Sequence, residues 1–95
     1  MGGDVRPKAT LRLVGFDEGG VSGSPTNLRL VCRIASGGKL AIWGKSGSRT
    51  NIDKVLQAGM PCTVVCEYRE PNEFHAVEYG HTHWVREDMD LEVVG

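Results

Sequence analysis

Cationic and aromatic side chains recur at alternate positions within residues 28–46. Because successive side chains of a strand point to opposite faces, these residues would share one face of a β-hairpin that turns at residues 36–38. Phosphates are attracted to positive charge and unpaired bases stack on flat aromatic rings, so such a face suits a single-stranded nucleic acid. A plain solvated face with one tryptophan is the alternative. The candidate binding residues are Arg29, Arg33, Lys39, Trp43 and Lys45.

The opposite face of the same predicted hairpin is apolar and would belong to a hydrophobic core. Leu30 and Ile34 lie on that side of the first strand, and Leu40 and Ile42 continue it on the second. Applied along the chain, this alternation and the helical periodicity predict a single set of buried residues. The predicted core comprises Leu11, Leu13, Leu30, Ile34, Leu40, Ile42, Val55, Leu56, Val64, Leu91 and Val93.

Cysteine and histidine are the residue types that could hold a metal ion. Cys62 and Cys66 lie four positions apart on a predicted strand, which separates them by ~13 Å, too far for both to bind one ion. His81 and His83 would need a third ligand from elsewhere in the chain. We therefore expect the cysteines to be small buried hydrophobes, and we predict neither a metal site nor a cofactor.

The sequence offers little support for catalysis. Cys66 could in principle act as a nucleophile with His75 or His83 as its base. However, Cys66 shares its strand face with Val64, and no neighbouring feature marks its thiol as activated. The acidic residues form a solvated surface rather than a general acid–base pair. We predict that the protein is not an enzyme.

Charge is distributed unevenly along the chain, although the formal net charge is only −1. Residues 1–58 carry nine basic and four acidic side chains, whereas residues 59–95 carry two basic and eight acidic ones. Such an asymmetry suits a polyanionic partner. It equally suits oppositely charged faces that meet in a homo-oligomer or with a protein partner.

Length, cysteine content and hydropathy narrow the class of protein. A chain of 95 residues suits one small domain with a single core. Three cysteines form no disulfide framework, so we expect reduced thiols and a cytoplasmic protein. No apolar run is long enough to span a bilayer, and residues 1–10 lack the apolar core of a signal peptide, so we expect no membrane partner.

Strands dominate the expected secondary structure. Residues 1–7 are expected to form a flexible leader, and residues 8–95 a single domain. The first strand covers residues 8–16 and bends or bulges near Gly15. The following Gly/Ser/Pro-rich segment, residues 17–26, is expected to be a mobile loop.

One helix is expected, at about residues 51–58. Thr50 and Asp53 have the spacing of a capping box, in which two side chains bond orphan backbone groups reciprocally. Gly59 and Pro61 would end the helix. So short a helix is unstable alone, and its apolar stripe must dock onto the sheet.

Two further strands are expected at residues 60–70 and 83–94, with a turn at 70–73 and an irregular or short extended stretch at 74–79. The resulting order of three strands, one helix and two strands resembles that of the OB-fold over residues 8–94. The resemblance implies an all-β fold with one short helix, namely a five-stranded Greek-key barrel whose helix lies between strands three and four.

In OB-folds the outer surface of strands two and three, with the adjoining loops, holds oligonucleotides or oligosaccharides. The resemblance places the two flanking loops at residues 17–26 and 70–82 of this chain. The implied strand surface comprises Arg29, Val31, Arg33, Lys39, Ala41, Trp43 and Lys45.

Trp84 and Arg86 fall on the outer face of the last predicted strand, where they could extend the cationic and aromatic face or contact a protein. Tryptophan and arginine are favoured at protein interfaces. Because Asp88 and Asp90 would repel phosphates, we expect a protein contact or surface packing there.

These features together predict a non-catalytic module that binds single-stranded DNA or RNA through the outer hairpin face. Trp43 would stack on a base while the cations hold phosphates, with little sequence preference. The alternative is a protein-interaction or self-assembling OB-like domain that binds no nucleic acid.

Overall fold

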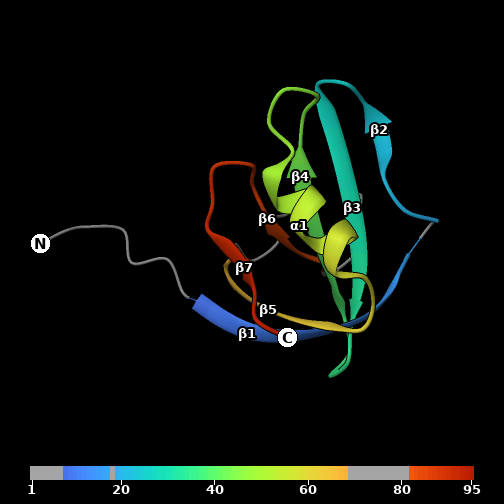
Figure 1. Ribbon diagram of the computed structural model, residues 1–95. Coiled ribbons are helices and arrows are strands. Elements are labelled where there is room, and N and C mark those ends of the chain that lie inside the picture. Colours follow the sequence, from blue (N-terminus) through green and yellow to red (C-terminus); the bar gives the residue numbers. More distant parts are fainter. Residues whose placement is uncertain (1–7, 18, 69–81) are drawn as a thin grey trace, which may run out of the picture.

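The computed structural model describes residues 8–17, 19–68 and 82–95 (Figure 1). The predicted leader, the 70–73 turn and the 74–79 stretch lie outside these residues. The described part is mostly β with one short helix, which confirms the predicted all-β class, although its sheet has seven strands where five were predicted. Its elements are β1 (Lys8–Phe16), β2 (Ser22–Ser24), β3 (Asn27–Ile34), β4 (Lys39–Gly44), α1 (Thr50–Ala58), β5 (Cys62–Glu67), β6 (Thr82–Val85) and β7 (Leu91–Val93).

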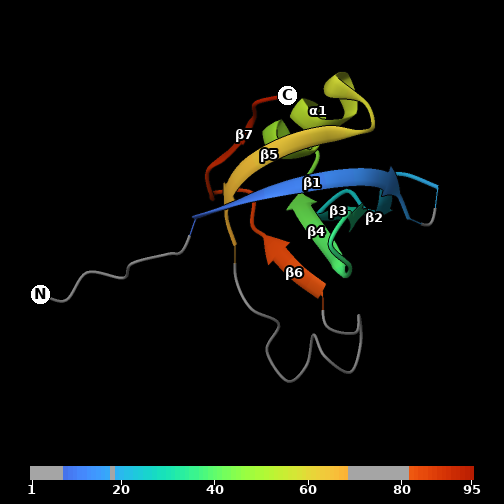
Figure 2. The ribbon, with the colours of Figure 1, turned by 90° about the horizontal axis from the view of Figure 1, so that it is seen from below.

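One sheet contains all seven described strands. Its hydrogen-bonded order is β6-β4-β3-β1-β5-β7, and β2 pairs separately with β3. The pairing of β4 with β6 is parallel, whereas the other described pairings are antiparallel. The end strands β6 and β7 are joined by only residues 86–90, so the sheet must curl to bring its two ends together (Figure 2).

A bulge in β1 provides part of this curvature. The pairing of β1 with β3 shifts register between Leu13 and Gly15, as predicted for the glycine. A Cβ atom at Gly15 would clash with the Arg33 guanidinium, which occupies the space beside the glycine. The Arg33 Nη1 atom donates a hydrogen bond of 3.0 Å to the Phe16 carbonyl oxygen.

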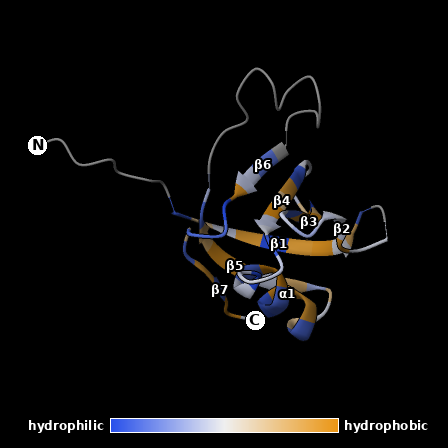
Figure 3. Cartoon of the chain, turned by 90° about the horizontal axis from the view of Figure 1, so that it is seen from above, coloured by the Kyte–Doolittle hydropathy of each residue, from blue (hydrophilic) through white to orange (hydrophobic). Residues whose placement is uncertain are grey.

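The predicted hairpin faces are confirmed by the burial of their apolar side chains. Leu30, Leu40 and Ile42 are fully buried, and β3 pairs with β4 in the register Leu30↔Ile42. Figure 3 shows hydrophobic residues along β1, β4 and β5. The other predicted core residues that are buried are Leu13, Ile34, Val55, Val64 and Leu91; Leu11 and Val93 are partly buried and pack against this core.

Helix α1 is present as predicted, but its beginning and its buried face differ from the prediction. The capping box is wrong: Arg49 is the N-cap, no side chain caps the helix, and Asp53 instead accepts a 2.9 Å hydrogen bond from Arg49 Nε. Leu56 is 37% exposed, so its assignment to the core is also wrong. The helix is turned so that Asn51 faces inward beside Ile52 and Val55.

Two glycines fix where α1 ends and how closely it approaches the sheet. Gly59 has φ of +75° and donates its backbone N–H to the Val55 carbonyl, which confirms the predicted glycine stop. A Cβ atom at Gly44 would lie 3.0 Å from both Ile52 Cδ1 and the Ser48 carbonyl oxygen. The missing side chain lets the helix lie directly against β4 (Figure 1).

Three predicted segments have different bounds in the structure. The 17–26 loop contains β2, which forms a small hairpin with the start of β3. The predicted 60–70 strand is shorter, as β5. The predicted 83–94 strand is broken into β6 and β7, because residues 87–89 form a turn in which the backbone N–H of Met89 bonds the Arg86 carbonyl.

The one helix in the described residues has nine residues and is too short to cross a membrane.

Candidate nucleic-acid interface

The parallel pairing of β4 with β6 places a second tryptophan on the predicted binding face. Ala41 is the register partner of Trp84, and Ile42 is the partner of Val85. Ile42 and Val85 are fully buried, so the alternate residues Ala41, Trp43 and Trp84 point to the outer face. Ala41 lies on that face between its register partners Val31 and Trp84, and it is only 3% exposed.

A pocket of 240 Å³ lies at the edge of the sheet that β6 forms. Both tryptophans line it, together with two cations and one acid. The residues that bear on its chemistry are Asn27, Trp43, Lys45, Trp84, Arg86 and Glu87. Such a site offers positive charge and hydrogen-bonding groups beside two indole side chains.

The predicted cations do not all lie at this pocket. Lys45 lines it, and its Nζ atom lies 3.5 Å from Glu87 Oε1. Arg29 on β3 lies beside its register partner on β4, Trp43. Lys39 and Arg33 lie at the opposite end of the hairpin, where both approach the same acid, Asp17.

Asp17 neutralises part of the positive charge that the sequence suggested. Its carboxylate lies 2.8 Å from Lys39 Nζ and 4.0 Å from Arg33 Nη1. The two cations are about half exposed, and exposed ion pairs contribute only about 0–1 kcal/mol. A phosphate could therefore compete with Asp17, but the charge there is weaker than a count of cations suggests.

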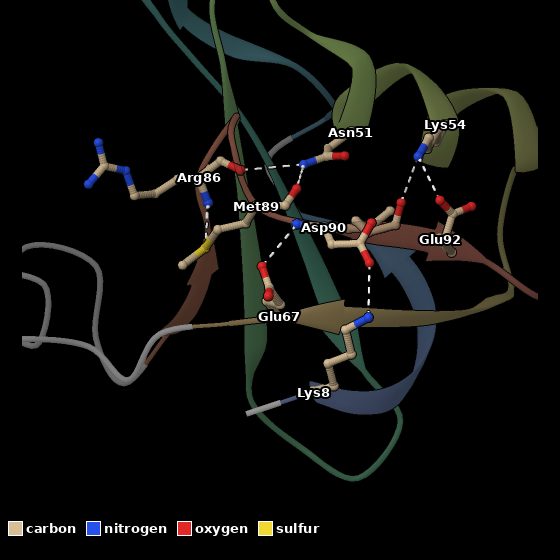
Figure 4. Close-up of polar contacts among 9 residues, drawn as sticks. Lys8, Asn51, Lys54, Glu67, Arg86, Met89, Asp90 and Glu92 are labelled. Carbon is tan, nitrogen blue, oxygen red and sulfur yellow. Dashed lines mark hydrogen bonds and ion pairs between the residues drawn. The ribbon is translucent and has the colours of Figure 1, made fainter. Parts of the chain in front are cut away.

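Helix α1 holds the segment that contains Arg86 and Glu87, which line the pocket. Figure 4 shows the contacts. The buried Asn51 side chain donates two hydrogen bonds from Nδ2, one of 2.8 Å to the Met89 carbonyl and one of 3.3 Å to the Arg86 carbonyl. The backbone N–H of Arg86 also lies 3.3 Å from Met89 Sδ. These contacts fix the backbone next to Glu87.

A second anchor lies one helical turn further along α1. Lys54 Nζ donates a 2.8 Å hydrogen bond to the Leu91 carbonyl and lies 3.2 Å from Glu92 Oε1. On the other side, Lys8 pairs with Asp90 at 3.0 Å, and the Asp90 N–H donates to Glu67. The break between β6 and β7 is therefore held from both sides (Figure 4).

The sequence does not identify Asn51, and for Trp84 it favours a protein contact or surface packing over an extension of the binding face. The expectation of a protein contact or surface packing at Trp84 rests on the nearby Asp88 and Asp90, whereas the pairing of its strand with β4 has no local signal in the sequence. Asn51 carries a weak signal: a polar residue next to Ile52, on the side of the helix that faces the protein.

The three cysteines are free and buried, as expected of small hydrophobes. Burial raises the pKa of the Cys32 thiol to about 12, with a smaller contribution from Cys62. Burial likewise raises the pKa of the Cys66 thiol to about 11. Thiols with such pKa values are protonated at neutral pH and are poor nucleophiles.

Possible metal ligands are dispersed where the structure describes them. The described residues contain no group of three or more His, Cys, Asp or Glu side chains placed to hold a metal ion. His83 contacts Tyr68 edge to face, with ring centroids 5.1 Å apart. His75 and His81 lie outside the described residues.

Comparisons with protein-family models, with curated proteins and with solved structures each found no match for this chain. The function must therefore be argued from the residues at the pocket and on the face around it.

Proposed function

We propose that the protein binds single-stranded nucleic acid on the outer face of β4 and β6, with the 240 Å³ pocket as its base site. The observation that carries this proposal is the parallel β4–β6 pairing, which brings Trp84 and Arg86 alongside Trp43 and Lys45. Two indoles and two cations at one concavity supply the stacking surface and the phosphate contacts that an unpaired strand requires.

The order of the strands supports an OB-like architecture for this proposal. Counting β6 and β7 as halves of one interrupted strand leaves five principal strands and the small β2. The interrupted strand pairs with β4 through one half and with β5 through the other. Helix α1 lies between the third and fourth principal strands. This arrangement agrees with a partly open Greek-key barrel, whose strands two and three are a common site for oligonucleotides.

Each side chain has a separate task in the proposed complex. Trp43 and Trp84 stack on bases, and each stack is worth about 1–3 kcal/mol. Lys45 and Arg86 contact the backbone phosphates, which releases counterions and makes binding salt-dependent. Recognition of most positions in the strand is tolerant of sequence, because every base has a π-face.

Titration of a fluorescein-labelled oligo-dT strand at two salt concentrations tests the proposal. Trp84→Ala and Trp43→Ala should each weaken binding by about 1–3 kcal/mol with little change in salt dependence. Lys45→Ala should instead reduce the slope of log K against log salt by roughly 0.7.

Lys8→Ala is the matched control for Lys45→Ala. Lys8 is an exposed lysine in an ion pair, as Lys45 is, but it does not line the pocket. Its removal should leave the salt slope unchanged. Absence of any change in anisotropy or tryptophan fluorescence with oligo-dT at low salt would overturn the proposal.

A protein-interaction surface is the second candidate function. It is favoured by the ion pairs that Lys39 and Lys45 already make with acids of the same chain, which reduce the charge left for phosphates. Trp84 and Arg86 are also residue types that dominate protein interfaces. Light scattering decides this point: a dimer mass that Trp84→Ala converts to a monomer mass would favour this function.

A further inference from the structure

Glu87 is the one acidic side chain among the pocket-lining residues that the structure describes. A carboxylate is unfavourable near phosphates, so a general strand-binding surface gains nothing from it. Its side chain is only 27% exposed, whereas that of its neighbour Lys45 is 53% exposed. The acid is therefore set into the pocket wall, where it would meet a base rather than the backbone.

Lys45 and Glu87 present a hydrogen-bond donor and an acceptor side by side. The Lys45 Nζ atom lies 3.5 Å from Glu87 Oε1, so the lysine and the carboxylate can address neighbouring groups of one planar ligand. The ammonium only donates hydrogen bonds, and the ionised carboxylate only accepts them. Trp43 and Trp84 line the same pocket and would flank the ring of that ligand.

We propose that this pocket selects guanine, an inference that rests on the proposed function. Guanine presents a carbonyl oxygen, O6, next to two adjacent donors, the ring N1–H and the 2-amino group. The Lys45 ammonium has three N–H donors, so one can bond O6 while another keeps the phosphate contact. The two carboxylate oxygens of Glu87 accept from N1–H and the 2-amino group. A carboxylate can accept such a pair of bonds in bidentate fashion.

The other common bases match this arrangement less well. Thymine and uracil offer a single ring N–H flanked by two carbonyl oxygens, and these oxygens repel a carboxylate. Cytosine and adenine offer one amino group next to a ring acceptor, which allows only a single hydrogen bond to Glu87. The selectivity arises from the carboxylate, since the tryptophans stack on any base.

The backbone around Glu87 is fixed before a ligand arrives. Asn51 bonds the carbonyl groups of Arg86 and Met89 on either side of it. A preset acceptor loses less conformational entropy on binding than a mobile one, which favours discrimination between bases.

A set of thymidine oligonucleotides that differ at one central base tests the inference. The central base is guanine, hypoxanthine (which lacks only the 2-amino group), cytosine or thymine. The wild-type protein should bind the guanine strand roughly 5- to 100-fold more tightly than the thymine strand. The hypoxanthine strand should bind with an intermediate affinity.

Glu87→Gln should abolish the preference for guanine over hypoxanthine without lowering the affinity for the all-thymidine strand, because it removes a negative charge. Asp88→Asn is the matched control: it removes a neighbouring exposed acid that does not line the pocket, and it should retain the preference. Equal affinities of the wild type for all four strands would overturn the inference while leaving strand binding intact. Failure to bind any strand would overturn the proposed function as well.

Discussion

The two faces of the β3–β4 hairpin acquire their neighbours in different ways. On the inner face, Leu30 lies opposite Ile42 in the same hairpin, and both are fully buried in the core. On the outer face, Trp43 shares a pocket with Trp84, which is 41 positions away in sequence, and Lys45 pairs with Glu87. The inner face is built around a local pairing, whereas the outer site depends on a distant strand.

This difference separates stability from the proposed binding. Inner-face residues gain free energy by leaving water, which any well-packed apolar neighbour can provide. The outer residues act together only while β6 pairs with β4 and residues 86–90 are held by α1. Changes on the two faces should therefore have separable effects.

The largest expected effect comes from the inner face. Leu30→Ala should lower the free energy of unfolding by roughly 2–5 kcal/mol, because it removes buried methyl groups and leaves a cavity. Chemical denaturation followed by tryptophan fluorescence measures the change. Lys45→Ala on the outer face is the control and should alter stability by less than about 1 kcal/mol. Equal losses for the two variants would contradict the division between the faces.

Loss of the Asn51 hydrogen bonds, which connect helix α1 to the pocket wall, should give the next largest effect on stability. Asn51→Ala leaves the buried Met89 carbonyl without its side-chain donor and should cost about 1–3 kcal/mol of stability. It should also weaken oligonucleotide binding, because the Arg86 and Glu87 wall loses its anchor. Gln57→Ala, an exposed change on the same helix, should affect neither property. Intact binding in folded Asn51→Ala would show that the wall needs no anchor.

The buried Cys32 thiol should make the core sensitive to alkaline pH. Its pKa is raised to about 12 in the folded protein, so above about pH 9 the unfolded chain releases a proton that the folded chain keeps. The protonated Cys32 thiol makes its full contribution to the free energy of unfolding below that pH. As the pH rises toward 12, this contribution should fall by about 1.4 kcal/mol per pH unit. Urea denaturation between pH 8 and 10.5 measures this loss. A Cys32→Ala variant with the wild-type pH slope would refute it.

The smallest effect is expected at the end of the hairpin remote from the pocket. Lys39→Ala removes an exposed pair with Asp17 and should change stability by only about 0.2–1 kcal/mol. Asp17→Asn releases both Lys39 and Arg33 from this acid and should strengthen binding to oligo-dT at low salt. Unchanged affinity in Asp17→Asn would limit the interface to the pocket end of the face.

Features that depend on neighbouring residues could be predicted from the sequence more reliably than features that depend on distant ones. The bulge at Gly15 and the glycine stop at Gly59 follow from backbone freedom at single positions. The capping box failed because Arg49 lies close enough to take Asp53 as its partner. Leu56 was assigned to the wrong face because the orientation of α1 is set by the bonds of Asn51 to residues 86–90.

The sequence by itself determined the strand-rich fold class, the extents of β1 and of the hairpin, and the separation of apolar from cationic faces. These features follow from alternation and turn residues, which act over a few positions. Only the tertiary structure decided that the last strand breaks at residues 86–90 and that β6 pairs with β4 in parallel. A parallel pairing joins segments that are distant in sequence, and no local periodicity encodes which strand a distant segment will join. The pocket lined by Trp43 and Trp84 is therefore a product of the fold.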